Sequence, residues 1–307
     1  MTRVIFAGTP DFALASLRAL VESGRIPVAV LTQPDRPAGR GKKLTAGPVK
    51  QYAAEQGIPV LQPVSLRDET VVAELKALRP DMLIVAAYGL ILPQDVLDIP
   101  THGCVNVHAS ALPRWRGAAP IQAAILAGDE TTGISLMSMT AGLDCGPVYT
   151  VEKVTIGDAE TAEELHDRLA VLGGRVLVDH LDDIVAGNAV ATEQDESLAT
   201  YAPKIVTSDA RIDWSVAAAE LERRVRAYNP FPGAFFFAGD SRIKSWRATA
   251  VDGDAEPGTV LQCNRDGIVV ACGSSALRLD ELQLAGKRRV PASDFPGQLD
   301  LSGLRLG

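Results

Sequence analysis

Three polar residues with chemically useful side chains occupy alternate positions in one apolar stretch of the chain. Asn106, His108 and Ser110 are separated by small or branched apolar residues. This alternation predicts a β-strand with the amide, the imidazole and the hydroxyl on one face. An amide can polarise a carbonyl group and an imidazole can move a proton, so these residues are the first candidates for catalysis. The alternative is a buried strand end whose polar groups satisfy one another.

The surrounding residues predict an open α/β sheet that would position these side chains. Short apolar strands are expected at residues 3–7, 28–31, 82–86, 133–139 and 147–155. Amphipathic helices are expected at residues 12–21, 48–56, 68–78 and 162–185. Alternating strands and helices favour a Rossmann-like, doubly wound sheet with helices on both faces. The strand carrying Asn106 stops at Pro113, so its polar residues would emerge at the carboxyl edge, where such sheets bind ligands.

The pattern changes in the last third of the chain. Residues 187–208 lose their periodicity and are interpreted as a linker. A helix is expected at residues 217–227, followed by short strands at residues 233–237, 242–246, 258–262, 267–272 and 277–283. Such strands predict a small β-barrel, with an OB-like fold as one option. A chain of 307 residues exceeds the usual domain length, so two domains are expected, at residues 1–186 and 209–307.

Composition and charge narrow the class of protein. A hydrophobic content of 47% and a charged content of 22% are typical of a soluble globular protein. The four cysteines are scattered and show no metal-ligand spacing, so no metal is expected. The apolar stretch at residues 4–7 is too short for a signal peptide, so a cytoplasmic protein is expected. The net charge of −8 argues against non-specific coating of nucleic acid. The segment Gly8-Thr9-Pro10 lacks the later glycines of a dinucleotide-binding loop, which argues against NAD.

A basic loop interrupts this acidic chain between residues 33 and 48. It carries the cationic residues Arg36, Arg40, Lys42 and Lys43 together with several glycines and prolines. This composition cannot build a core, so an exposed and mobile loop is expected. Its charge favours contact with the phosphates of an extended anion. The alternative is a solvated loop without a partner.

A turn supplies a candidate carboxylate. Asp144 lies between Gly142 and Gly146, which favours a turn that projects its side chain. If the carboxylate lay beside His108, it would orient the imidazole and favour its protonated form. The alternative is an isolated, solvent-facing acidic residue.

Together these segments resemble the signatures of a known family. Asn106-Val107-His108, the run from Ser110 to Gln122, and Gly142-Leu143-Asp144 with Gly146 resemble the folate-dependent formyltransferases. The basic loop and the segment Ala210–Trp214 narrow the resemblance to the methionyl-tRNA formyltransferase family. The chain departs from the family at Ala111, where leucine is usual, so the wall of the pterin pocket would differ slightly.

The resemblance implies a function and assigns site residues. A Rossmann-like N-terminal domain would hold 10-formyltetrahydrofolate as a co-substrate, and a C-terminal barrel would help to bind tRNA. The formyl group would pass to the free amino group of methionine on initiator methionyl-tRNA, for translation initiation, without a metal. The implied catalytic residues are Asn106, His108 and Asp144. The implied folate-binding residues are Ser110, Ala111, Leu112, Pro113, Tyr88, Leu90 and Ile91. The implied tRNA-binding residues are Arg36, Arg40, Lys42 and Lys43.

Three other functions fit part of the pattern. A sugar-nucleotide or glycinamide-ribonucleotide formyltransferase would use the same trio without the basic loop. A formyltetrahydrofolate hydrolase would use water as the nucleophile. A non-catalytic RNA-binding protein would not need Asn106, His108 and Asp144. We expect a monomer that does not bind membranes.

Overall fold

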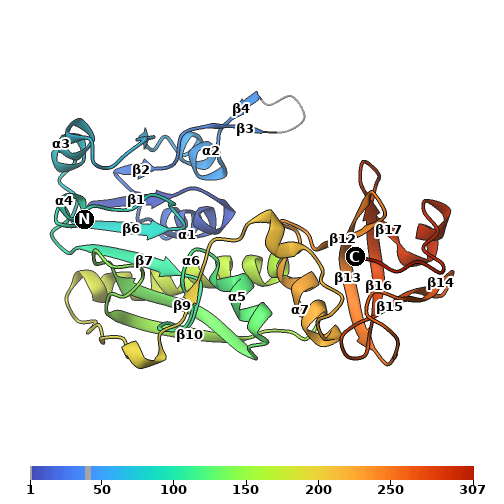
Figure 1. Ribbon diagram of the computed structural model, residues 1–307. Coiled ribbons are helices and arrows are strands. Elements are labelled where there is room, and N and C mark those ends of the chain that lie inside the picture. Colours follow the sequence, from blue (N-terminus) through green and yellow to red (C-terminus); the bar gives the residue numbers. More distant parts are fainter. Residues whose placement is uncertain (1, 39–42) are drawn as a thin grey trace. The chain divides into compact units, whose positions relative to one another are not determined.

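The computed structural model describes residues 2–38 and 43–307 (Figure 1). The chain folds into two compact units. The first comprises the described residues up to 120 together with residues 131–155 and 166–202. The second comprises residues 121–130, 156–165 and 203–307. The predicted order of an α/β fold followed by a small β-barrel is confirmed.

The first unit contains a seven-stranded sheet with the order β10-β9-β7-β6-β1-β2-β5. The five strands β7, β6, β1, β2 and β5 are paired in parallel. Strand β9 pairs antiparallel with β7, and β10 pairs antiparallel with β9. Only residues 139–147 join β9 to β10, which is too short for a helical crossover of about a dozen residues. The strands are β1 Val4–Gly8, β2 Ala29–Leu31, β5 Val60–Leu61, β6 Met82–Ala86, β7 Cys104–His108, β9 Thr131–Ser138 and β10 Val148–Thr155.

Helices cover both faces of this sheet, as predicted. On one face, Leu75 and Val96 pack in one apolar cluster with Ile5 and Leu83. On the other face, a long helix lies against Val107. The helices of this unit are α1 Asp11–Glu22, α2 Pro48–Glu55, α3 Glu69–Ala77, α4 Gln94–Leu97 and residues 166–185 of α6 Ala162–Val185, whereas α5 Pro120–Ala127 lies almost entirely in the second unit. Local sequence sets some of their ends: Asp68 caps α3 by accepting a hydrogen bond from the Thr70 N–H at 2.9 Å.

The second unit is an antiparallel barrel with the strand order β12-β13-β16-β15-β14, and β17 pairs with β16. Leu221 and Val225 of its helix pack in the core with Phe236. Trp214 meets Phe236 edge to face, with 5.3 Å between the ring centroids. The elements are α7 Ala218–Ala227, β12 Phe235–Ala238, β13 Ser241–Val251, β14 Val260–Asn264, β15 Gly267–Ala271, β16 Ala276–Leu284 and β17 Val290–Pro291.

Residues 304–307 close this barrel. Strands β12 and β14 are the two ends of the strand order, and the tail hydrogen-bonds to both sides. The Phe237 N–H donates to the Gly307 carbonyl at 3.2 Å, and the Leu306 N–H donates to the Gly258 carbonyl at 2.8 Å. Gly258 has a φ of +87°, and any side chain there would collide with the Leu306 carbonyl. The tail therefore satisfies sheet edges that would otherwise be exposed.

Short elements complete the chain, and one of them corrects a prediction. The sequence predicts an exposed, mobile loop here, whereas the described residues on its two sides pair as an antiparallel ribbon, with Arg36 opposite Thr45. The pairing satisfies backbone groups that a long loop would leave without partners. These elements are β3 Arg36–Ala38, β4 Lys43–Thr45, β8 Arg116–Gly117, β11 Tyr201–Ala202, and the 3-10 helices Glu196–Leu198, Thr207–Ala210 and Ala292–Gly297.

The expected linker, residues 187–208, contains β11, which pairs in parallel with β8 of the first unit.

Within the part of the chain that the structure describes, no helix combines the length and apolar character needed to cross a bilayer.

Candidate active site

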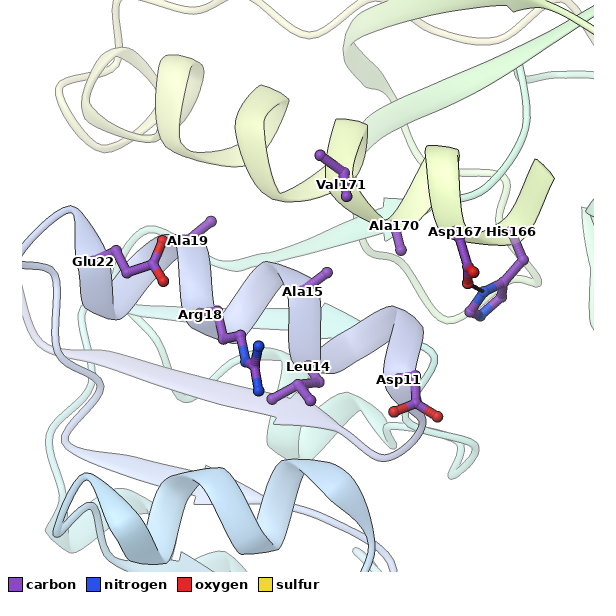
Figure 2. A pocket seen from close by; sticks show the side chains of 10 residues that line it. All are labelled: Asp11, Leu14, Ala15, Arg18, Ala19, Glu22, His166, Asp167, Ala170 and Val171. Atoms are coloured by element: carbon purple, nitrogen blue, oxygen red, sulfur yellow. Dashed lines mark hydrogen bonds and ion pairs between the residues drawn. The ribbon is translucent and has the colours of Figure 1, made fainter. Parts of the chain in front are cut away.

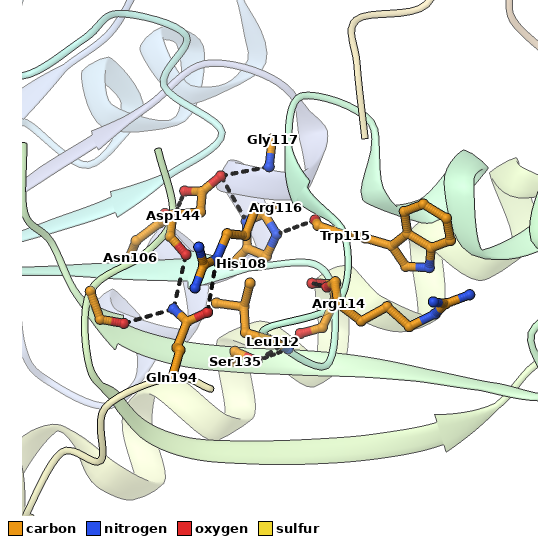
Figure 3. Close-up of polar contacts among 12 residues, drawn as sticks. Asn106, His108, Leu112, Arg114, Trp115, Arg116, Gly117, Ser135, Asp144 and Gln194 are labelled. Carbon is orange, nitrogen blue, oxygen red and sulfur yellow. Dashed lines mark hydrogen bonds and ion pairs between the residues drawn. The ribbon is translucent and has the colours of Figure 1, made fainter. Parts of the chain in front are cut away.

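Strand β7 carries two of the predicted catalytic residues at the carboxyl edge of the sheet. Asn106 and His108 are both buried and lie on one face of the strand (Figure 3). Val107 lies on the opposite face, against α6. The alternation predicted from the sequence is therefore confirmed for this part of the strand.

Ser110 lies beyond the end of this strand, which corrects the prediction that the strand continues to Pro113. Strand β7 ends at His108, and the Ser110 side chain is fully buried in the turn that follows. Its hydroxyl donates to the Arg114 carbonyl at 2.6 Å. Ser135 on β9 holds the same turn, because its hydroxyl donates to the Ser110 carbonyl at 2.7 Å and accepts from the Leu112 N–H at 3.1 Å. The Ser110 hydroxyl thus stabilises the turn.

The His108 ring lies between a backbone carbonyl and a carboxylate. Nε2 lies 3.0 Å from the Trp115 carbonyl oxygen, and Nδ1 lies 3.7 Å from Asp144 Oδ2. A carbonyl only accepts hydrogen bonds, so Nε2 carries a proton in this arrangement. Nδ1 is therefore the ring nitrogen at which a proton can be exchanged, next to a negative charge.

Asp144 reaches this site from the turn between β9 and β10. Its side chain is only 16% exposed, which excludes the alternative of an isolated, solvent-facing residue. Oδ2 accepts the Gly117 N–H at 2.8 Å, and Oδ1 accepts the Asn106 amide at 3.4 Å. Its φ of +48° lies in the left-handed region, which costs about 1–2 kcal/mol for a residue with a Cβ. The contacts of the turn must therefore hold it there.

Gly117 is required where β8 meets β11. Its φ is +112°, and a Cβ at this position would lie 2.7 Å from the Ala202 carbonyl oxygen. Only glycine allows this approach while its N–H points at Asp144. Strand β8 thus lies between Asp144 on one side and β11 on the other.

A polar network that the sequence did not reveal surrounds this strand (Figure 3). Arg116 is buried and donates to Gln194 Oε1 at 3.0 Å. Its guanidinium also binds both carboxylate oxygens of Glu196, at 2.8 and 2.9 Å. This pairing raises the pKa of Arg116 and lowers that of Glu196. Gln194 and Glu196 lie in a polar run that carries no motif, so the sequence indicated only a linker.

The predicted folate-binding segments follow neighbouring parallel strands, β6 and β7. Tyr88 is buried, its hydroxyl has no partner among the described residues, and burial raises its pKa. Its carbonyl accepts hydrogen bonds from Thr9 and from Gln33, each at 3.1 Å. Leu112 is buried, whereas Leu90, Ala111 and Pro113 are half-buried. Ile91 is 82% exposed, an unusual state for an isoleucine beside a site.

Two of the predicted tRNA-binding residues, Arg36 and Lys43, lie on the β3–β4 ribbon. Arg36 and Lys43 are exposed, and Arg36 donates to the side chain of Gln33. The base of the ribbon is held by an ion pair of 2.7 Å between Lys50 Nζ and Asp35 Oδ2, which lowers the pKa of Asp35. Arg40 and Lys42 lie outside the described residues.

The second unit carries a cluster of cations stacked on aromatic rings. The Arg242 guanidinium lies 3.7 Å from the ring centroid of Phe235. Arg289 and Lys244 lie 3.6 and 4.9 Å from the ring centroid of Trp246. Burial, together with the charges of Arg242 and Arg289, lowers the pKa of Lys244. The cluster is therefore a region of concentrated positive charge on the barrel.

A groove of about 420 Å³ lies elsewhere, between α1 and α6 (Figure 2). Leu14, Ala170 and the exposed Val171 line its apolar part. Arg18 and the hydrogen-bonded pair of His166 and Asp167 lie at its polar parts. It contains none of the predicted site residues.

Comparison with known families identifies both halves of the chain. A family model described as formyl transferase matches residues 2–181. A second, described as formyl transferase, C-terminal domain, matches residues 204–298.

Curated proteins resemble the chain over its whole length. A protein of Methylococcus capsulatus named methionyl-tRNA formyltransferase is 52% identical, covering 99% of each chain. A protein of the same name from Xanthomonas campestris pv. campestris is 53% identical over 99% of this chain and 100% of its own.

Solved structures share the fold at low sequence identity. The sugar 3N-formyltransferase WlaRD is 15% identical with a TM-score of 0.68, covering 94% of this chain and 99% of its own. HypX from Aquifex aeolicus, in complex with tetrahydrofolic acid, is 17% identical with a TM-score of 0.65. The match with HypX covers 96% of this chain but only 47% of HypX.

Proposed function

The chain belongs to the methionyl-tRNA formyltransferase family, and we propose that it transfers the formyl group of 10-formyltetrahydrofolate to the methionine of initiator methionyl-tRNA. This reaction prepares the initiator for translation. The observation that carries the proposal is the convergence of an amide, an imidazole and a carboxylate at the carboxyl edge of the sheet. The full-length relatives supply the identity of the acceptor.

The reaction exchanges one carbon–nitrogen bond for another. The methionine amino group attacks the formyl carbon, and the carbonyl oxygen becomes an oxyanion. The bond from this carbon to the folate nitrogen then breaks. The attacking amine loses a proton and the folate nitrogen gains one. The site must therefore stabilise one negative oxygen and move one proton.

Asn106, His108 and Asp144 match these two tasks. The Asn106 amide has two N–H groups, of which one is directed at Asp144, and we assign the other to the oxyanion. Loss of one such donor typically lowers the rate by about 10²–10³-fold. We assign proton transfer to His108 Nδ1. The carboxylate 3.7 Å away would stabilise the charged ring.

The segments after β6 and β7 are the proposed folate site. A pterin ring has apolar faces and polar edges. The exposed side chain of Ile91 can cover such a face, and the buried hydroxyl of Tyr88 is a polar group without a partner among the described residues. Both observations fit a bound folate. Ala111, Leu112 and Pro113 would contribute through the turn that follows β7.

Two basic surfaces are proposed to contact tRNA. Arg36 and Lys43 on the ribbon are exposed, and the sequence adds Arg40 and Lys42. On the barrel, the cluster of Arg242, Lys244 and Arg289 combines positive charge with aromatic rings, a combination suited to nucleic acid.

The proposed division of the chain is a formyltransferase domain at residues 1–186, a linker at residues 187–208 and a tRNA-binding barrel at residues 209–307. The ranges of the two family models support it.

The test is formyl transfer with a choice of acceptors. Purified protein is supplied with 10-formyltetrahydrofolate and either initiator methionyl-tRNA, elongator methionyl-tRNA, an amino sugar nucleotide or buffer. We expect rapid formylation of the initiator and slow reaction with the rest. Faster transfer to the amino sugar would contradict the proposed acceptor, and release of formate in buffer at the same rate would indicate a hydrolase.

A further inference from the structure

We propose that Gln194 is a positioning residue for Asp144, although it lies 50 residues away in the segment expected to be a linker. This inference rests on the proposed catalytic role of Asp144. It concerns a residue to which no motif of the sequence assigns a role.

The Gln194 amide clamps the backbone of the turn that carries Asp144. Nε2 donates to the Asp144 carbonyl at 2.9 Å and to the Gly146 carbonyl at 2.7 Å (Figure 3). An amide nitrogen has two N–H groups, so both are used on this turn. The two carbonyls flank Cys145, and holding both fixes the peptide planes that follow Asp144 and Gly146.

The orientation of Gln194 is itself fixed. Its Oε1 accepts from Arg116 Nε at 3.0 Å, so the oxygen faces a group that only donates. The nitrogen faces two carbonyls that only accept. An exchange of the amide oxygen and nitrogen would break all three hydrogen bonds, so the network allows a single orientation.

The clamp holds the turn in a backbone conformation that is unfavourable by itself. Asp144 has a φ of +48°, which a residue with a Cβ rarely adopts. Without the two hydrogen bonds from Gln194, the turn would relax toward ordinary conformations. The carboxylate would then move relative to Gly117 and His108, which it contacts at 2.8 and 3.7 Å. A misplacement of about 1 Å can lower a rate by about 10²-fold.

Arg116 joins the clamp to the other side of the site. Its neighbours on either side contact the proposed catalytic residues: the Trp115 carbonyl binds His108, and the Gly117 N–H binds Asp144. One buried guanidinium thus links the strand that orients both residues to the amide that holds the Asp144 turn. Gln194 would act on catalysis through this turn, without touching the substrates.

The test is a double-mutant cycle of Gln194→Met with Asp144→Asn. Methionine keeps the length and removes the hydrogen bonds. We expect Gln194→Met to lower kcat by about 10–100-fold, with the KM of each substrate within about three-fold of the parent. In the Asp144→Asn background the same change should alter kcat by less than about three-fold, because the carboxylate that it positions is gone. Gln94→Met, on the exposed face of α4, is the matched control and should leave kcat unchanged.

Each result decides between positioning and general support of the fold. The inference would be overturned if Gln194→Met lowered kcat by the same factor in the parent and in the Asp144→Asn variant. A normal kcat for Gln194→Met alone would also overturn it. A normal kcat for Asp144→Asn would instead overturn the catalytic assignment of Asp144, so the two failures are distinguishable. If Gln194→Met does not fold, Gln194→Glu retains the length and the acceptor for Arg116 but loses both donors. It should show the same dependence on Asp144, and independence would refute positioning.

Discussion

The imidazole of His108 is oriented by the carbonyl of Trp115, at 3.0 Å from Nε2. Trp115 itself has a φ of +63°, a conformation that costs about 1–2 kcal/mol. The tautomer of His108 is therefore set by the backbone of the loop that follows β7. The Asp144 carboxylate lies 3.7 Å from Nδ1, the nitrogen to which we assign proton transfer in the proposed reaction.

Replacing His108 by alanine should abolish transfer while folate binding stays within a few-fold. The ring exchanges a proton in the proposed reaction, and its polar contacts are with Trp115 and Asp144, outside the proposed folate-binding residues. Loss of a general acid–base typically lowers a rate by about 10²–10⁴-fold. Single-turnover formylation and folate affinity are measured separately. A variant retaining more than about a tenth of the parent rate would contradict the assignment.

Replacing Asp144 by asparagine should lower kcat by about 10²-fold or more. The substitution keeps the shape but removes the charge that stabilises the imidazolium. The Asn side chain retains an oxygen for the Gly117 N–H, so the turn should remain folded. The rate is measured beside the thermal unfolding midpoint. A low kcat with an unchanged thermal unfolding midpoint supports a chemical role for the carboxylate. If kcat and the unfolding midpoint both fell, the role of Asp144 would be structural.

Replacing Arg40, Lys42 and Lys43 together by alanine should weaken tRNA binding and flatten its dependence on salt. Each phosphate contact that is lost should reduce the salt slope by about 0.7–0.9. Folate affinity should not change. Lys76→Ala, an exposed lysine on α3, serves as the control for the loss of one positive charge outside this segment. Equal slopes for the triple variant and the control would show that the ribbon does not contact phosphate.

The four cysteines should react in two classes. Cys104 and Cys272 are buried, and burial raises the pKa of their thiols to about 12 and about 11. Cys145 and Cys263 are half-buried. At pH 8.5, iodoacetamide should label Cys145 and Cys263 first, and all four cysteines in urea, as read by mass spectrometry. Labelling of Cys104 at the rate of Cys145 in the folded protein would contradict this order.

The same shifts predict a loss of stability in alkali. A thiol with a raised pKa keeps its proton in the folded state after the unfolded chain has released it at about pH 8.5. The free energy of unfolding should therefore fall as the pH rises from about 8.5 toward 11. Urea midpoints at several pH values measure this slope. Cys104→Ala should be less stable throughout but show a shallower slope.

Features set by local pattern were predictable, and features set by distant contacts were not. The strand at Met82–Ala86 and the helix at Ala162–Val185 have the predicted bounds, because a buried run and a long amphipathic period are local properties. The predicted end of β7 was wrong because the Ser110 hydroxyl stabilises a turn. The alternation of polar and apolar residues does not distinguish a hydroxyl in a turn from one on a strand. Gln194 was missed because its partners lie about 50 and 80 residues away and depend on the folded chain.

Removing residues 304–307 should destabilise the barrel more than any single side-chain change in that segment. The deletion removes the backbone hydrogen bonds that the tail makes to Phe237 of β12 and to Val260 of β14, and it removes Leu306, which is 5% exposed. Burial of one leucine contributes about 1.5–3 kcal/mol. Leu306→Ala removes that contribution but keeps the backbone pairing, so its thermal unfolding midpoint should lie between those of the parent and the deletion.

Gly258→Ala keeps the tail but pushes it away from residue 258, because the added Cβ meets the Leu306 carbonyl. It should therefore approach the deletion in effect, whereas Arg305→Ala, at an exposed position, should stay near the parent. A deletion with the midpoint of Leu306→Ala would show that the side chain alone matters and that the tail does not close the barrel.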